Sequence, residues 1–369
     1  ISAMTSILAV FLLIYLIDFK NNIKKTPKDF LIFVFFYLWR FITLIFKGYF
    51  WEGISRFFHG IWDKFPYAFC SNIKIDKDKI LRFIDILLWA NMIVLAYALL
   101  QNYLDFPVIF KKLFTSDGER FKGFHSHPLR FAGYYSTVCV IAFSFGLFYS
   151  KKYIYMFAVL FFGLLLNGSR TYWFSVVLTF FVISFIKNKK IFFISALILI
   201  VYLISFFVVF KQYTKRVESG VGLSQSGSSI SLRKNFWKAG FEIFNKNPIL
   251  GVGDRKVSDY LKPYLERGEI DNTAHCHNNY ITVMAETGIF GLFLLLWIYF
   301  HFIKKYFNLF KSFSDDFSKA FSISLLAIFI SISLSGLTEH NFGTFLLWGF
   351  VSFYMGIYES YYNEKGIKK

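Results

Sequence analysis

Four of the seven histidines occur in two His-x-His pairs, and the second pair precedes an expected helix. His275 and His277 are followed by two asparagines and then by an apolar run that begins at Tyr280. Either asparagine can cap the helix, which would place His277 at the positive end of the helix dipole. This dipole disfavours imidazolium, so we expect His277 to stay neutral near pH 7, where an imidazole can take a proton from a hydroxyl group.

Two other uses of this pair compete with proton transfer. The histidines can be a plain polar cap at a membrane surface. They can also bind zinc together with Cys276. Alternating residues rarely complete a tetrahedral site without distant ligands, so we expect no metal here.

Two arginines occur where they could bind phosphate. Arg170 follows Asn-Gly-Ser at the expected start of a membrane span, and its guanidinium group matches phosphate oxygens. Arg233 falls in the first turn of an expected helix, where a cation opposes the helix dipole and a bound anion would offset that cost. The alternatives are an Arg170 that snorkels to lipid headgroups and an Arg233 that is simply solvated.

The chain lacks the motifs of nucleotide and magnesium sites. Gly251-x-Gly253 follows a helix rather than a strand and lacks the third glycine of a dinucleotide fingerprint. A P-loop does not occur, and no carboxylate cluster in the sequence is suited to bind Mg²⁺. Glu286 falls inside an expected span, where we expect it to pair with an arginine or a backbone group. We therefore expect no cofactor.

The composition indicates a polytopic membrane protein. The 369 residues are 56% hydrophobic and 17% charged, whereas soluble domains contain about 25% charged residues. The net charge is +18, but the lysines form short runs between apolar blocks rather than one basic stripe. This placement is typical of the loops of membrane proteins and argues against a nucleic-acid partner.

Apolar blocks of about 20 residues predict membrane-spanning helices. They cover residues 1–17, 30–46, 81–101, 130–149, 153–168, 170–186, 191–210, 279–302, 318–338 and 342–360. The aromatic stretch 50–71 is either one more span or an interfacial helix. If it crosses, the lysine runs all fall on one side, which would be cytoplasmic. We therefore expect an all-α bundle of about 11–12 spans, the twelfth preceding Ile1.

This topology divides the chain into N-terminal spans at 1–210, one large outer loop at 211–278 and C-terminal spans at 279–369. Within the loop, apolar residues at helical spacing predict an amphipathic helix over 232–245. The polar candidates converge on the same outer side: His125, His127, Arg130, Arg170, Arg233, His275, His277, Glu339 and His340.

Three stretches carry a resemblance to a known family. The first runs from Arg233-Lys-Asn-Phe-Trp to Asn247-Pro-Ile-Leu-Gly-Val-Gly and is similar to R-x3-W … P-x-x-G-x-G. The second runs from His275-Cys-His-Asn-Asn-Tyr-Ile to Glu286-Thr-Gly-Ile-Phe-Gly and is similar to H-x-H-N-x-Y-(L/I) … E-x-G-x-x-G. The third is Gly-Ser-Arg170, which opens a span. Together they resemble the O-antigen ligase and O-antigen polymerase superfamily of bacterial envelope glycosyltransferases.

This resemblance implies a GT-C-like helical fold in the bacterial inner membrane, with a periplasmic loop over a membrane-embedded cavity. The implied reaction transfers a glycan from undecaprenyl diphosphate to an acceptor hydroxyl, with inversion and without metal or nucleotide. By the same resemblance, His277 would be the general base, with His275 as the second choice. Arg170 and Arg233 would bind the diphosphate, and Arg216 and Arg130 could join them.

Our first interpretation is an O-antigen ligase that acts on lipid A–core in lipopolysaccharide synthesis, because one substantial outer loop ends in the H-x-H-N motif. An O-antigen polymerase, with a lipid-linked glycan as acceptor, is the main alternative. A protein O-oligosaccharyltransferase usually has an additional soluble C-terminal region. The given sequence ends at Lys369, just past an expected span, so we expect this alternative less. A transporter of lipid-linked saccharides is the rival from another class, and it would need ionisable groups towards both membrane faces.

Overall fold

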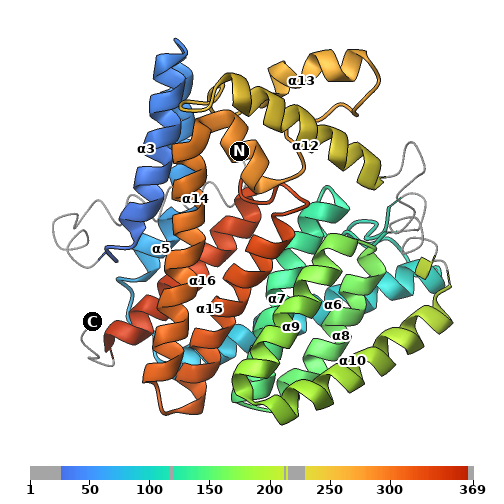
Figure 1. Cartoon of the computed structure of the whole chain (residues 1–369). Coiled ribbons are helices and arrows are strands. Elements are labelled where there is room, and N and C mark those ends of the chain that lie inside the picture. Colours follow the sequence, from blue (N-terminus) through green and yellow to red (C-terminus); the bar gives the residue numbers. More distant parts are fainter. Residues whose placement is uncertain (1–25, 116–119, 212, 215–228, 365–369) are drawn as a thin grey trace.

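The computed structural model is a bundle of long helices with two further helices across one end (Figure 1). It describes residues 26–364 except 116–119, 212 and 215–228. The expected span at 1–17 and the candidate Arg216 lie outside the described residues. The described helices are α3 (Phe30–Phe46), α4 (Phe50–Trp62), α5 (Phe65–Cys70), α6 (Lys77–Tyr103), α7 (Pro128–Phe148), α8 (Lys152–Asn167), α9 (Arg170–Lys187), α10 (Lys189–Val209), α12 (Ser229–Lys246), α13 (Val257–Glu266), α14 (Asn279–Ser312), α15 (Asp316–Ser335) and α16 (Phe345–Glu364).

Six described helices are long and apolar enough to cross a membrane, namely α6, α7, α9, α10, α14 and α15. Helices α3 and α8 are apolar but have only 17 and 16 residues. The expected span at 342–360 corresponds to α16, which is less apolar because it contains serines, tyrosines and Glu359. The predicted all-α polytopic membrane fold is thus confirmed.

Helices α12 and α13 lie across what we call the site end of the bundle (Figure 1). The predicted loop helix at 232–245 is confirmed and extends over Ser229–Lys246. Its buried Phe236 and Ile243 form a small apolar core with residues of α13 and the start of α14. Gly240 allows this close approach, since a Cβ there would overlap Ile281.

The lysine runs of the described residues gather at the opposite end, as the sequence predicts. Lys77, at the start of α6, lies 5.5 Å from the ring centroid of Tyr149, which follows α7. Lys187, at the end of α9, lies 4.5 Å from the Phe148 ring. Lys305 of α14 binds Asp29, which caps α3 at the same end.

Residues 50–71 do not form one continuous span. They form the two short helices α4 and α5, which are interrupted at Asp63 and Lys64. Arg56 of α4 donates to the Asp254 carbonyl near the site end, and Tyr67 of α5 lies near Lys305. The segment therefore passes between the two ends as a broken helix. At the break, the buried Lys64 is paired with Asp63 at 2.6 Å.

Helix α14 is also interrupted, at Gly288, whose φ of 69° and ψ of −168° are not helical. Such a break leaves backbone groups without intrahelical partners, which is costly inside a membrane protein. Residues 248–254, which we call the clip, supply the missing partners. Three hydrogen bonds join the clip to the break: Val252 N to Ala285 O at 3.0 Å, Gly253 N to Glu286 O at 2.8 Å, and Ile289 N to Pro248 O at 2.9 Å.

Two side chains of α3 complete this junction. Trp39 Nε1 donates to the Thr287 carbonyl at 2.8 Å. The buried guanidinium of Arg40 binds the Asp254 carboxylate of the clip and reaches Glu286 Oε2 at 3.2 Å. The expectation that Glu286 pairs with an arginine is confirmed. The clip, which lies within the 211–278 loop, therefore joins this loop to α3 and to the first turns of α14.

We predict that Gly288→Ala destabilises the protein by about 3 kcal/mol or more, because the residue occupies a backbone region reserved for glycine and a Cβ would overlap the Ile249 carbonyl. Thermal unfolding of the purified protein in detergent measures the effect.

The matched control is Gly268→Ala, which has a similar φ of 70° but no atom within 4 Å of the added Cβ. Its cost should be only about 1–2 kcal/mol. Equal losses of stability in the two variants would contradict the role assigned to the clip.

Candidate functional site

The start of α14 is capped as the sequence predicts. Asn278 Oδ1 accepts from the backbone N–H groups of Tyr280 at 2.8 Å and Ile281 at 3.0 Å. Its Nδ2 donates to the Leu337 carbonyl at 2.7 Å. The cap therefore also binds the turn between α15 and α16.

The neighbouring Asn279 fixes the same turn more firmly. Its Oδ1 accepts from the backbone N–H of Asn341 at 2.9 Å and of Phe342 at 3.1 Å, and its Nδ2 donates to Asn341 Oδ1 at 2.6 Å. The turn also contains Glu339 and His340. The two asparagines thus bring these side chains next to His277.

Three histidines cluster at this junction. His277 has a φ of 48°, and its backbone N–H donates to His275 Nδ1 at 3.2 Å. The His275 ring centroid lies 4.6 Å from that of His277 and 4.9 Å from that of His340. Cys276 points away into the apolar core beneath α12, so the three residues of the zinc alternative do not converge.

Glu339 is the carboxylate of this cluster. Its side chain is 5% exposed, and it forms an ion pair with Arg233 of α12. Its other oxygen, Oε2, lies 3.8 Å from His277 Nδ1. One buried carboxylate is therefore shared between a permanently charged guanidinium and the imidazole expected to act as base.

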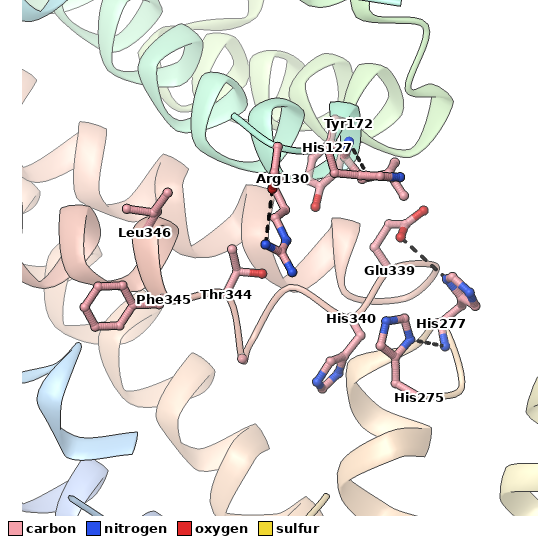
Figure 2. A pocket seen from close by; sticks show the side chains of 13 residues that line it. His127, Arg130, Tyr172, His275, His277, Glu339, His340, Thr344, Phe345 and Leu346 are labelled. Atoms are coloured by element: carbon pink, nitrogen blue, oxygen red, sulfur yellow. Dashed lines mark hydrogen bonds and ion pairs between the residues drawn. The ribbon is translucent and has the colours of Figure 1, made fainter. Parts of the chain in front are cut away.

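The histidines face a cavity of about 620 Å³, shown in Figure 2. This volume is in the range of small-molecule sites. We call it the histidine cavity. It is lined by Ser126, His127, Leu129, Arg130, Tyr172, His275, His277, Glu339, His340, Gly343, Thr344, Phe345 and Leu346.

A second cavity, of about 550 Å³, has mainly apolar walls. We call it the apolar cavity. Its three cationic residues, Arg170, Arg233 and Lys234, come from α9 and α12. The rest of its wall is Phe161, Leu165, Thr171, Trp173, Phe174, Val177, Leu203, Phe207, Ile230, Trp237 and Thr338.

Residues of the two cavities meet at one place, which we call the partition. The Thr171 and Thr338 hydroxyls are hydrogen-bonded at 2.8 Å on the side of the apolar cavity. The ion pair of Arg233 and Glu339 joins a residue of the apolar cavity to a residue of the histidine cavity. Ligands in the two cavities would therefore approach each other across these side chains.

The structure groups the candidate residues in two sets. His275 and His277 share the histidine cavity, and Arg170 and Arg233 share the apolar cavity. Arg130 lies in the histidine cavity, apart from the other two arginines. The sequence groups Glu339 with the other candidate residues on one side of the protein. It does not indicate the role of Glu339, because its partners Arg233 and His277 are distant from it in the chain.

Burial lowers the pKa of three histidines of this site. It lowers the pKa of His275 to about 4, with a further decrease from His277 and an opposing effect of Glu339. Burial also lowers the pKa of His340 well below its usual value, and the nearby His275 adds to the effect. The pKa of His127 falls because of burial and then because of Arg120 and Arg130.

We predict that acid destabilises the protein through these histidines. An unfolded histidine titrates near 6.5, above the folded pKa of about 4 for His275. The stabilisation is therefore complete above pH 6.5 and is lost as the pH falls from 6.5 towards 4. Thermal unfolding between pH 7.5 and 5 should show this loss. The loss of thermal stability on acidification should be smaller in His275→Asn than in the wild type, and it should be undiminished in the control His59→Asn. Equal losses in the two variants would contradict the role assigned to His275.

Comparison with known proteins agrees with this geometry. The family described as O-antigen ligase matches residues 154–296, which extend from α8 into α14. The match includes Arg170, Arg233 and the His275/His277 pair. No curated protein matches the chain significantly. This match over the central segment supports the resemblance of the chain to the O-antigen ligase and polymerase superfamily.

Proposed function

We propose that the protein is an O-antigen ligase of the bacterial inner membrane. It would transfer a glycan from undecaprenyl diphosphate to a sugar hydroxyl of lipid A–core on the periplasmic face, with inversion and without metal or nucleotide. The observation that carries the proposal is the pair of cavities divided by the partition. One cavity suits a lipid diphosphate, and the other presents a base.

The apolar cavity is the proposed donor site. A polyprenyl chain needs apolar walls, which α8, α9 and α10 supply, and its diphosphate needs cations, which Arg170 and Arg233 supply. When the sugar leaves, negative charge builds up on the diphosphate. Fixed guanidinium groups stabilise this charge without a protein acid.

The histidine cavity is the proposed acceptor site. His277 takes the proton of the acceptor hydroxyl while that oxygen bonds to the anomeric carbon of the donor sugar. The bond from this carbon to the diphosphate oxygen breaks, and its electrons leave with the diphosphate. His275 is the weaker candidate for the base, since its Nδ1 accepts from the His277 backbone and its pKa is about 4.

Glu339 is the proposed positioning residue. In the structure its charge is paired with Arg233. A bound diphosphate would compete for Arg233 and leave the carboxylate beside His277, which is 3.8 Å away. The carboxylate would then stabilise the imidazolium that forms during proton transfer. Donor binding and base strength would thus be coupled.

We predict that His277→Asn lowers transfer about 10²- to 10⁴-fold and Arg233→Gln about 10²- to 10³-fold. The assay uses the purified protein, a synthetic undecaprenyl-diphosphate glycan, EDTA and no nucleotide, with lipid A–core and lipid-linked glycan as separate acceptors. The control Arg267→Gln removes an exposed guanidinium that directly follows α13 and lines neither cavity, so it should retain full activity.

The acceptor arms decide between the members of the superfamily. Transfer to lipid A–core identifies a ligase, whereas extension of the glycan on its own lipid carrier identifies a polymerase with the same site. Binding of the donor without transfer to either acceptor would support a transporter.

A separate prediction concerns Glu339→Gln. The loss of the carboxylate charge removes the stabilisation of the imidazolium, so kcat should fall about 10- to 100-fold and the acidic limb of the pH–kcat profile should move to lower pH. The KM for the donor should not rise, because Arg233 loses a competing partner. A lower kcat with an unshifted pH profile would mean that Glu339 is only structural.

A further inference from the structure

The histidine cavity contains one cation that the proposed reaction does not use. Arg130 lies in the first turn of α7, where a positive charge opposes the helix dipole. Its guanidinium donates to Ser126 Oγ at 3.3 Å. Within the described residues it forms no ion pair with a carboxylate.

The residues that line the histidine cavity include a positive charge without a negative partner. Arg130 and Glu339 are the residues of its lining that carry a formal charge, besides the histidines. Glu339 is already paired with Arg233 at the partition. Apart from the histidines, the formal charge of this lining that has no partner of opposite charge among the described residues is therefore that of Arg130.

The position of Arg130 fits a ligand that also reaches the base. Figure 2 shows its guanidinium above Thr344, across the cavity from His275 and His277. The first turn of α16 begins at this same wall with Phe345, and its dipole adds to the positive potential. A saccharide with its hydroxyl at His277 can therefore direct a second group towards Arg130.

We propose that Arg130 binds an anionic group, a phosphate or a carboxylate, on the acceptor saccharide. The histidine cavity then selects acidic acceptors over neutral ones. This inference rests on the proposed function, because it assumes that the acceptor occupies this cavity. It separates Arg130 from Arg170 and Arg233, which lie beyond the partition and face the donor.

The test measures acceptor selectivity in the purified full chain. Three synthetic core glycolipids would be compared that differ in one substituent near the acceptor hydroxyl: a phosphate, a uronic carboxylate or a neutral hydroxyl. Wild-type protein should use the better anionic acceptor with a kcat/KM about 10- to 100-fold above that of the neutral one, mainly through a lower KM. Whichever of the phosphorylated and carboxylated glycolipids gives the higher kcat/KM identifies the anionic group that Arg130 binds.

In Arg130→Gln this ratio should fall close to one, whereas Arg130→Lys should restore part of it through its charge. The control Arg267→Gln, directly after α13, should keep the wild-type ratio. Thermal unfolding checks that the variants are folded, which we expect because Arg130 is exposed.

Two results would overturn the inference. In the first, the wild-type protein uses the three acceptors with equal kcat/KM. In the second, Arg130→Gln lowers kcat/KM by the same factor with every acceptor and raises the KM for the donor, which would assign Arg130 to the diphosphate. If no acceptor is glycosylated, the proposed function fails instead. Calorimetric binding of the phosphorylated and neutral glycolipids to wild type and Arg130→Gln then tests the anion site by itself, and equal affinities would reject it.

Discussion

The buried guanidinium of Arg40 holds together the part of the protein on which the site depends. It binds Asp254 of the clip and Glu286 of α14, next to the break at Gly288. A buried charge is stable only when it is paired, so these three residues must assemble together. The first turns of α14 are fixed by this junction on one side and by the outer loop on the other. They present His277 to the cavity.

The site itself depends on one shared carboxylate. Glu339 connects Arg233, which faces the apolar cavity, with His277, which faces the histidine cavity. In the proposed reaction, this arrangement would keep two substrates of different polarity in separate cavities that meet at these side chains. The hydrogen-bonded pair of Thr171 and Thr338 completes the partition. This arrangement gives a physical reason for placing the base and the arginines on different helices.

The other buried charges of the bundle form fixed pairs. Lys64 is bound to Asp63, and Lys305 is bound to Asp29 and Glu359 at the end opposite the site. The pairs of Lys305 join α14 to α16 and to the start of α3, whereas Lys64 and Asp63 pair locally between α4 and α5. A transporter would need ionisable groups along a path between the faces. The observed pairs instead stabilise a rigid frame, which agrees better with an enzyme whose site lies at one end.

The sequence by itself determined the features that arise from local spacing. The apolar blocks, the lysine runs at one end, the amphipathic helix α12 and the Asn278 cap all follow from residues within a few turns of each other. Tertiary structure alone decided the break in residues 50–71, the role of Glu339 and the separation of Arg130 from Arg170 and Arg233. Glu339 and Arg233 are 106 positions apart, and Arg40 and Glu286 are 246 positions apart. Such contacts depend on how whole helices pack, so the spacing of residues along the sequence does not predict them.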